Sequence, residues 1–457
     1  MRSRKKLGLW SALPPYLGGK RRLAPMIFRE IDRLVPRRLW PQLTFLDAFM
    51  GGASISLFAK AQAFGRVIGT DLALRSVTIG QALVANNRVK LNKADVLRVL
   101  QPSTRGPGPI ESNMVPGVFT REQARVIDHA LSIASHTEEV SKAALLRLLA
   151  MRIALLAHPY SQIRKGTIHR MASGEYESIT ESAVYHYVDG LRLATVPKLM
   201  ALAEQINGGV FEGCGEVHQI DIVEALPSIA ADVLYADPPY ANAMSYEREY
   251  RTLDQILEGV TRPTSPFSAK GGTAQIDRLL ERAAHVPVIV LSFGNADCSL
   301  DELEGKMLRL GRQTKAIAIR YAHLPAVASA AKMEANREFL VVGWDPDAPL
   351  LRDLSVDRAG IGNHAGGGDV DRAVPGVHVD PDPGGPERPA AEPLIVDGLQ
   401  EGDASVPEEV APNGRGLPVA ELQPGVNRPD AILAEAGLDG DGEGRVVTSS
   451  AHGPTVP

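Results

Sequence analysis

The stretch "LTFLDAFMGGASISLFAKAQAFGRVIGTD", residues 43–71, runs through a strand, a glycine turn, a helix and a second strand. The apolar run 43–49 predicts a buried strand, residues 51–64 a turn leading into an amphipathic helix, and 66–71 the next strand. Two strands joined by a helix pair in parallel within one sheet. Glycine lets the backbone approach a ligand, so we expect a ligand site beside Gly51, although such a turn alone is more often purely structural.

The same alternation of strands and helices continues in the second half of the chain. Residues 231–237 and 286–293 predict two more strands, with a helix over 276–285 between them. Residues 315–323 and 337–344 predict a closing antiparallel pair. The sequence therefore predicts an α/β fold with a mostly parallel sheet, helices on both of its faces and an antiparallel pair at one end.

Composition divides the chain into three regions. Residues 1–110 and 216–344 carry the strand and helix pattern, and 111–215 predict an inserted, mainly helical region beside the sheet. Residues 345–457 are acidic and rich in proline and glycine, with few aromatic residues. Such a segment buries too little apolar surface to offset its chain entropy, so we expect a disordered tail.

Charge is distributed unevenly along the chain. The overall formal charge is −5, but residues 1–344 carry a net charge of about +9 and the tail about −14. A basic body suits an anionic partner such as nucleic acid. Charge alone is equally compatible with a solvated surface that carries a few extra arginines.

Several classes of protein are disfavoured by simple features. The two cysteines, Cys214 and Cys298, lie far apart, which argues against a disulfide scaffold or a zinc module, so we predict no metal site. The basic N-terminus lacks the apolar core of a signal peptide, and the longest apolar run, 143–158, is too short for a membrane span. We expect a cytoplasmic protein without a membrane partner.

The segment "LYADPPY", residues 234–240, follows one of the predicted strands and carries a carboxylate, two prolines and an aromatic ring. The prolines continue neither a helix nor a central strand, so they present Asp237 and the Pro238 carbonyl at the carboxyl end of the strand. Pro239 stiffens this turn. Two acceptors and the face of Tyr240 suit a planar ring that bears an amine.

An amine conjugated to a base ring is a poor nucleophile. Hydrogen bonds to two acceptors draw its geometry towards tetrahedral and expose the lone pair, so neither a strong general base nor a cysteine is needed. A reactive electrophile is needed instead, and a sulfonium methyl group supplies one. A base in a duplex has to leave the stack to be reached.

Three motifs, in this order along the chain, resemble those of the Dam-like DNA adenine N6-methyltransferases. They are "PPYLGGKRRL" (14–23), "FLDAFMGGAS" (45–54) and "LYADPPY" (234–240), and the resemblance covers roughly residues 13–344. It implies a Rossmann-like methyltransferase fold, S-adenosyl-L-methionine as cofactor and double-stranded DNA as substrate. It also implies that the insertion 111–215 is the target-recognition region.

The resemblance carries individual roles to individual residues. The implied catalytic residues are Asp237, Pro238, Pro239 and Tyr240. The implied cofactor-binding residues are Tyr16, Lys20, Asp47, Gly51, Asp71, Asp221 and Asp237. Asp71 matches the acid that holds the ribose hydroxyls. Asp221 matches loosely an acid near the cofactor's adenine, and a helix-capping role is nearly as compatible with its position.

The insertion also contains a polar, basic stretch. Its candidates for phosphate or base-edge contacts with DNA are Arg164, Lys165, His169 and Arg170. Each taken singly fits a solvated or phosphate-positioning residue better than a base reader.

This sequence departs from the family pattern at a few places. Ala48 stands where proline is common, Gly51–Gly52–Ala53 replaces a G-x-G arrangement, and Tyr16 replaces the tryptophan of some members. These changes keep a small turn and an aromatic ring, so cofactor binding is expected to survive while its affinity stays open.

The motifs leave alternatives. Cytosine N4 is a second possible target, because both amines suit the same acceptor pair, and structured RNA is a more distant substrate. A different class of protein is also possible, namely a DNA-binding regulator that keeps the methyltransferase fold but does not catalyse the reaction. A nicotinamide-dependent oxidoreductase is disfavoured because the glycine turn lacks G-x-G-x-x-G. We expect the protein to be a monomer, and a restriction endonuclease is a possible companion protein.

Overall fold

A computed structural model describes most of the chain up to Arg352. The described residues are 8–16, 18–101, 106–115, 118–119, 121–157, 196–240, 247, 250–260, 265–269, 272–295, 298–320 and 336–352. All of them belong to the first of the chain's two units, Met1–Ile395. Among them, no helix is both long and apolar enough to cross a membrane.

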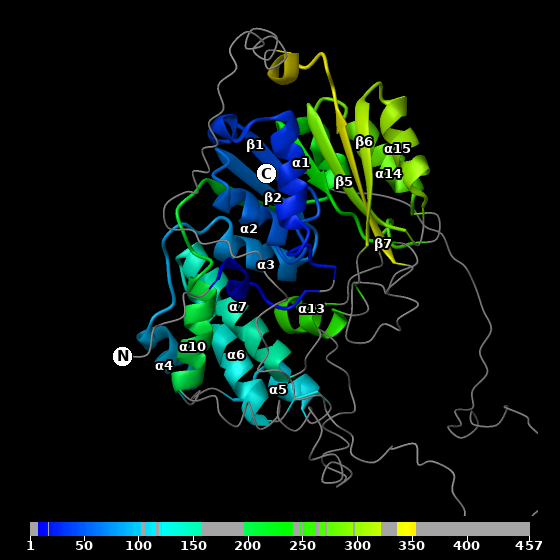
Figure 1. Ribbon diagram of the computed structural model, residues 1–457. Helices are drawn as coiled ribbons and strands as arrows, with labels where there is room; N and C mark the ends of the chain where they lie inside the picture. The colour runs from blue at the N-terminus through cyan, green and yellow to red at the C-terminus, as the bar shows by residue number, and fades with distance from the viewer. Residues whose placement is uncertain are drawn as a thin grey trace, which may run out of the picture. The chain divides into compact units, whose positions relative to one another are not determined.

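A seven-stranded sheet with the order β3-β2-β1-β4-β5-β7-β6 forms the centre of this unit (Figure 1). The first five strands in this order pair in parallel, while β7 pairs antiparallel with both β5 and β6. The strands are β1 (Thr44–Asp47), β2 (Arg66–Asp71), β3 (Gly215–Gln219), β4 (Val233–Ala236), β5 (Val288–Gly294), β6 (Gln313–Arg320) and β7 (Arg337–Trp344). The predicted mostly parallel sheet and its closing antiparallel pair are therefore confirmed.

Helices cover the sheet on both faces. The α-helices are α1 (Ala24–Leu34), α2 (Ser54–Ala61), α3 (Leu74–Leu83), α4 (Lys93–Leu100), α5 (Pro109–Met114), α6 (Arg121–Ser135), α7 (Val140–Ala157), α10 (Val196–Asn207), α11 (Ile222–Ala225), α13 (Arg251–Glu258), α14 (Ala274–Arg282) and α15 (Leu300–Arg309). The 3₁₀ helices are η1 (Leu9–Ala12), η2 (Arg37–Gln42) and η5 (Leu226–Ser228).

Strand side chains alternate between two apolar layers. Phe45 and Tyr235 belong to a large cluster that includes residues of α1, α2, α3 and α7. Their neighbours Leu46 and Leu234 belong to a second cluster with residues of α11, α14 and α15. Since successive side chains of a strand point to opposite faces, both faces of the sheet are buried, which is why these strands are apolar throughout.

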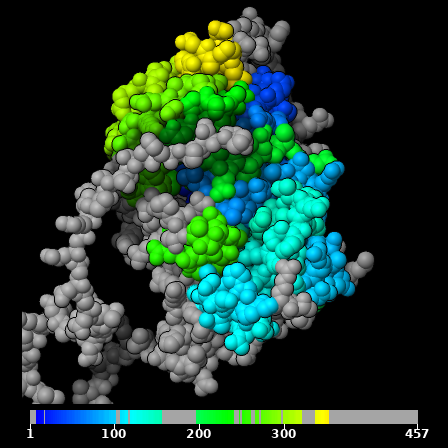
Figure 2. Space-filling model, turned by 180° about the vertical axis from the view of Figure 1, so that it is seen from behind, coloured from blue at the N-terminus to red at the C-terminus, as the bar shows by residue number. Residues whose placement is uncertain are grey.

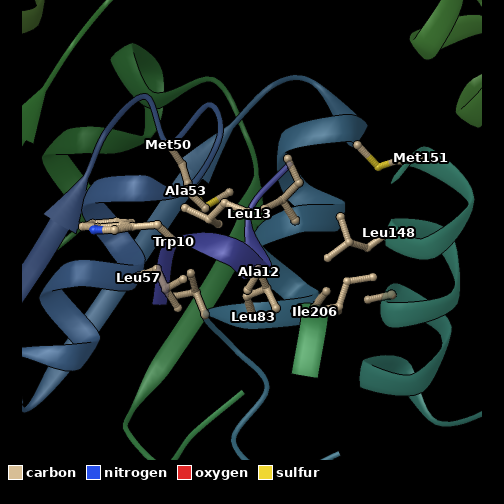
Figure 3. Close-up of a cluster of buried hydrophobic side chains, with 14 of the residues drawn as sticks. Trp10, Ala12, Leu13, Met50, Ala53, Leu57, Leu83, Leu148, Met151 and Ile206 are labelled. Carbon is tan, nitrogen blue, oxygen red and sulfur yellow. The ribbon is translucent and has the colours of Figure 1, made fainter. Parts of the chain in front are cut away.

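The region predicted as an insertion contributes to the first of these layers. Figure 3 shows Leu148 and Met151 of α7 and Ile206 of α10 in one apolar cluster with Leu83 of α3 and Trp10 of η1. In the view of Figure 2, the cyan helices of residues 109–157 lie at the lower end of the molecule's described part. The yellow-green strands and helices after residue 274 lie at the upper end. The described part of the insertion thus shares an apolar core with the sheet's helices.

The fold extends beyond the predicted boundary at residue 344. The backbone N–H of Asp345 donates to the carbonyl of Pro287 at 3.0 Å, and Ala348 is buried. The predicted tail from residue 353 onward lies outside the described residues.

Candidate active site

One cavity lies where β1, β2 and β4 end, beside the loop between β3 and α11. Its walls carry acids from each of these places, namely Asp47, Asp71, Asp221 and Asp237. The carboxyl ends of parallel strands meet at one edge of a sheet, so acids more than 150 residues apart in sequence converge here. Tyr16, Lys20, Gly51 and Pro239 also line this cavity, which brings together all seven predicted cofactor-binding residues.

The glycine turn between β1 and α2 is held by its own backbone. Gly51 has a φ of +50° and Ala53 a φ of +58°, both in the left-handed region that favours glycine. The N–H of Met50 donates to the carbonyl of Thr70 at 2.9 Å, and that of Ala53 to the carbonyl of Met50 at 2.8 Å. These bonds fix the turn at the start of α2.

The acid that ends β2 fastens this turn to the neighbouring strand. Asp71 Oδ2 accepts a hydrogen bond from the Gly51 N–H at 2.9 Å, and its Oδ1 accepts one from the Ala73 N–H at 2.8 Å. Each oxygen of a carboxylate can accept a further hydrogen bond. The side chain can therefore still receive hydroxyl donors from the cavity, as the predicted ribose contact requires.

Tyr16 packs directly on the glycine turn. A Cβ built on Gly52 would lie 2.7 Å from Tyr16 Cβ and 2.8 Å from its Cγ, so only glycine fits beneath this ring. The ring stacks on that of Tyr250, with 4.9 Å between centroids, and its hydroxyl lies 3.2 Å from Ser76 Oγ. Burial raises the pKa of the Tyr16 hydroxyl, which therefore stays neutral.

A buried ion pair braces the far side of these rings. Arg75 Nη1 lies 2.6 Å from both carboxylate oxygens of Asp254 in α13, and its guanidinium stands 4.5 Å from the centroid of Tyr250. Both charged side chains are almost fully buried. This pair joins α3, which follows Asp71, to α13, which follows the Asp-Pro-Pro-Tyr segment in the chain.

Asp47 places a buried carboxylate under the cavity. Its Oδ2 accepts hydrogen bonds from the N–H of Ser56 at 3.1 Å and from its Oγ at 2.6 Å. Its Oδ1 is buried and has no hydrogen-bond partner within the described part of the chain. Burial, helped by the charge of Asp237, raises the pKa of Asp47 to about 7, against the hydrogen bonds from Ser56.

Asp221 both lines the cavity and caps a helix. It is the N-cap of α11, where its Oδ1 accepts a hydrogen bond from the Val223 N–H at 3.0 Å. The capping role is therefore present, and the cofactor contact at the cavity wall stays a prediction.

Asp237 is held by side chains that come from outside its own strand. Lys20 Nζ lies 2.7 Å from its Oδ2, and the Tyr240 hydroxyl lies 2.9 Å from its Oδ1. The lysine also donates to the carbonyl of Gly18 at 3.1 Å and is 2% exposed. Burial raises the pKa of Asp237, and the ammonium of Lys20 opposes this rise. Lys20 thus contacts the predicted catalytic acid and also lines the cavity.

Tyr240 is not among the residues that line this cavity. The ring is 7% exposed and lies edge-on to Phe293, with 4.8 Å between centroids. A Cβ on Gly294 would come within 3.0 Å of the ring, so that glycine makes room for it. Pro238 is buried beside it, and Pro239 faces the cavity. Stacking of Tyr240 on a base stays a prediction.

Sequence reasoning missed one acid of this cluster. Glu338 of β7 is 0% exposed, and its Oε1 lies 2.8 Å from the Tyr240 hydroxyl, 2.7 Å from Ser292 Oγ and 3.3 Å from Lys20 Nζ. A charged residue inside the apolar run "REFLVVGW" was the available signal, because an acid is almost never fully buried without partners. Arg75 and its partner Asp254 were missed as well.

The predicted DNA contacts cannot be placed. Arg164, Lys165, His169 and Arg170 lie outside the described residues. Within the described ranges, no group of three or more histidine, cysteine, aspartate or glutamate side chains could hold a metal ion.

Comparison with known proteins agrees with the motifs. Residues 16–104 match the family described as D12 class N6 adenine-specific DNA methyltransferase, a segment that contains Tyr16, Lys20, the glycine turn and Asp71. The match confirms the resemblance to adenine-specific DNA methyltransferases that the three motifs predict.

Two curated relatives extend the similarity beyond this segment. The chain is 25% identical over 344 residues to the type II methyltransferase M2.HphI of Haemophilus parahaemolyticus, covering 71% of this chain and 95% of the relative. It is 23% identical over 295 residues to the type II methyltransferase M.NlaIII of Neisseria lactamica, covering 61% of this chain and 83% of the relative. No solved structure matches the chain significantly.

Proposed function

We propose that the chain transfers a methyl group from S-adenosyl-L-methionine to the N6 amine of adenine within a short sequence of double-stranded DNA. One observation carries this proposal: Asp237 stands at the edge of an acid-lined cavity, with its carboxylate fixed by Lys20 and followed by two prolines. The family match supports adenine as the target base.

The cavity suits a cationic cofactor. Asp47, Asp71, Asp221 and Asp237 give it an excess of negative charge, and the buried Oδ1 of Asp47 has an acceptor position to fill. S-adenosyl-L-methionine is cationic at both its sulfonium and its amino group, and when bound it supplies the electrophilic methyl group. We assign Tyr16, Gly51 and Asp71 to the turn-side wall of its site, and Asp221 to the loop after β3, the strand next to β2.

The catalytic segment acts on the base by hydrogen bonding. The adenine amine donates to Asp237 Oδ1 and to the carbonyl of Pro238, which exposes the nitrogen lone pair for direct in-line displacement. The stiff prolines hold both acceptors in place, so little reorganisation is needed in the transition state. Tyr240 supplies the aromatic surface on which the flipped base stacks.

Recognition of DNA falls to regions beside the cavity. We assign Arg164, Lys165, His169 and Arg170 to contacts with the duplex, on the basis of their place in the basic insertion. Binding should weaken steeply with salt, because phosphate contacts release counterions. We further propose that a monomer suffices for each base and that a restriction endonuclease accompanies the enzyme, as the type II class of its relatives suggests.

The test is expression in a bacterial host without DNA methylation, followed by single-molecule sequencing of its DNA. The expected result is N6-methyladenine in one fixed short motif, absent from cells that express Asp237→Ala at the same level. N4-methylcytosine would keep the chemistry and change the base. Soluble protein that binds S-adenosyl-L-methionine but leaves DNA unmodified would contradict the proposal.

A further inference from the structure

Four side chains from three separate parts of the chain meet in one cluster. Lys20 precedes α1, Asp237 and Tyr240 follow β4, and Glu338 lies on β7, opposite Gly294 of β5. Figure 1 shows β7 beside β5, which brings this acid under the catalytic segment. Lys20, Tyr240 and Glu338 are each 7% exposed or less.

The Tyr240 hydroxyl stands at the centre of this cluster with two competing acceptors. Asp237 Oδ1 lies 2.9 Å from it and Glu338 Oε1 lies 2.8 Å from it. Lys20 Nζ, at 3.1 Å, has only protons to give, so it acts as a donor to the same hydroxyl. A hydroxyl carries one proton, and therefore Tyr240 donates to Asp237 or to Glu338 but not to both.

The choice between these acceptors decides whether Asp237 can serve a base. Lys20 already engages Oδ2 of Asp237 at 2.7 Å. If Tyr240 donates to Oδ1, both carboxylate oxygens are engaged by the protein, and an incoming amine has to compete with the phenol. If Tyr240 donates to Glu338, Oδ1 is open to the amine.

We propose that Glu338 is a positioning residue that takes the Tyr240 hydroxyl proton and so leaves Asp237 Oδ1 to the N6 amine of the target base. This inference rests on the proposed function of Asp237. The charge distribution supports it, because Lys20 lies nearer to Asp237 than to Glu338 and neutralises its charge more. Glu338 also receives the Ser292 hydroxyl at 2.7 Å, which fixes its carboxylate under the ring.

The closing experiment is a double-mutant cycle between Glu338 and Tyr240. Glu338→Gln keeps the shape but removes the charge, so the phenol proton returns to Asp237, and methylation should slow by about 10- to 100-fold, the range for a hydrogen bond to a charged group. In the Tyr240→Phe background, which lacks the competing hydroxyl, the same change should cost less than about 3-fold. Equal losses in both backgrounds would overturn the role of Glu338.

A matched control is offered by Glu30 of α1. It is also a buried acid, 4% exposed, and it accepts a lysine hydrogen bond, from Lys315 at 2.6 Å, away from the cavity. Glu30→Gln should leave methylation unchanged. Thermal unfolding of all variants shows whether a loss of activity reflects a loss of fold.

A second readout needs no turnover. Duplexes with adenine or purine at the target position differ by the amine that Asp237 accepts, so the ratio of their dissociation constants, measured without cofactor, reports access to Oδ1. Glu338→Gln should lower the preference for adenine, and Tyr240→Phe should keep it. If Glu338→Gln does not fold, Tyr240→Phe alone decides: loss of the preference in this variant would overturn the proposal.

Failure of this inference is distinguishable from failure of the proposed function. A wild-type protein that leaves adenine unmethylated would overturn both. A wild-type protein that methylates adenine, with Asp237→Ala inactive and equal Glu338→Gln losses in the two backgrounds, overturns only the inference about Glu338.

Discussion

The glycine turn after β1 and the Asp-Pro-Pro-Tyr segment after β4 line the same cavity but are held in place by different means. The turn depends on the left-handed conformation of Gly51 and on hydrogen bonds to the adjacent strand β2, made to the Thr70 carbonyl and to the Asp71 carboxylate. The catalytic segment depends on side chains from distant parts of the chain, namely Lys20 and Glu338. The restraints on the first region come from the turn and its adjacent strand, whereas those on the second come from distant residues and can be changed there.

The largest expected effect comes from the catalytic segment itself. Asp237→Ala removes the acceptor of the base amine and leaves Lys20 without its closest carboxylate. We expect methylation to fall by at least about 10²- to 10³-fold, as when one preorganised transition-state contact is lost. Steady-state methylation of a duplex that carries the target site measures this loss, and a gel-shift titration should show nearly unchanged DNA binding. Wild-type turnover in this variant would remove Asp237 from the mechanism.

The glycine turn is broken most directly at Gly52. In Gly52→Ala the new methyl group meets the ring of Tyr16 at 2.7 to 2.8 Å, so the ring or the turn has to move. Overpacking of this kind costs about 1–3 kcal/mol, and we expect cofactor affinity to fall by roughly 5- to 150-fold. Isothermal titration with S-adenosyl-L-methionine checks this.

The control for this substitution is Gly305→Ala in α15. The nearest atom to its Cβ would be Arg309 Nη1 at 3.8 Å, so no clash arises, and alanine favours the helix. Cofactor affinity should be unchanged in this variant. Equal affinity in Gly52→Ala would mean that the turn yields as readily as the catalytic segment, and the comparison between the two regions would fail.

The pH dependence of stability tests the region of the glycine turn through Asp47. This acid ends β1 beside the turn, and burial makes its charged form unfavourable in the folded protein. Its pKa of about 7 in the folded protein exceeds the usual value of about 3.9 in an unfolded chain. The folded state therefore binds more protons between these values, and Asp47 destabilises the protein increasingly as the pH rises from about 4 to 7.

Asp47→Asn should remove this penalty while its side-chain oxygen still accepts from Ser56. We expect the cofactor-free variant to be more stable than wild type by about 2 kcal/mol at pH 8, with the difference shrinking towards pH 5. Urea unfolding at both pH values measures it. Lower stability at pH 8 would show that the fold favours the charge of Asp47.

The contrast between the two regions also explains what the sequence could predict. The strand at 66–71, the closing antiparallel pair and the acids at strand ends follow from local patterns, and the structure confirms each of them. Glu338 was missed because its function depends on β7 lying beside β5, a pairing across more than 40 residues. The edge-on contact between the rings of Tyr240 and Phe293 was missed for the same reason, because it depends on β5 lying beside β4.

The sequence predicted the strands more definitely than it predicted the role of the acid that follows β3. Asp221 was open to two roles because an acid after a strand either caps the next helix or faces a ligand, and here it does the first while lining the cavity. The recognition residues around Arg164 remain sequence-based predictions, since the geometry that would assign them lies outside the described ranges.

The smallest expected effect separates the two roles of Asp221. Asp221→Ser keeps a side-chain oxygen that caps α11, whereas Asp221→Ala removes it, so alanine should lower the free energy of unfolding by about 1 kcal/mol and serine by little. If the carboxylate also binds the cofactor, both variants should lose cofactor affinity to a similar extent. Unfolding without cofactor and titration with it measure the two effects separately. Normal affinity in Asp221→Ser, together with the loss of stability in Asp221→Ala, would assign this acid to the fold alone and restrict the cofactor's acidic contacts to the strand ends of β1, β2 and β4.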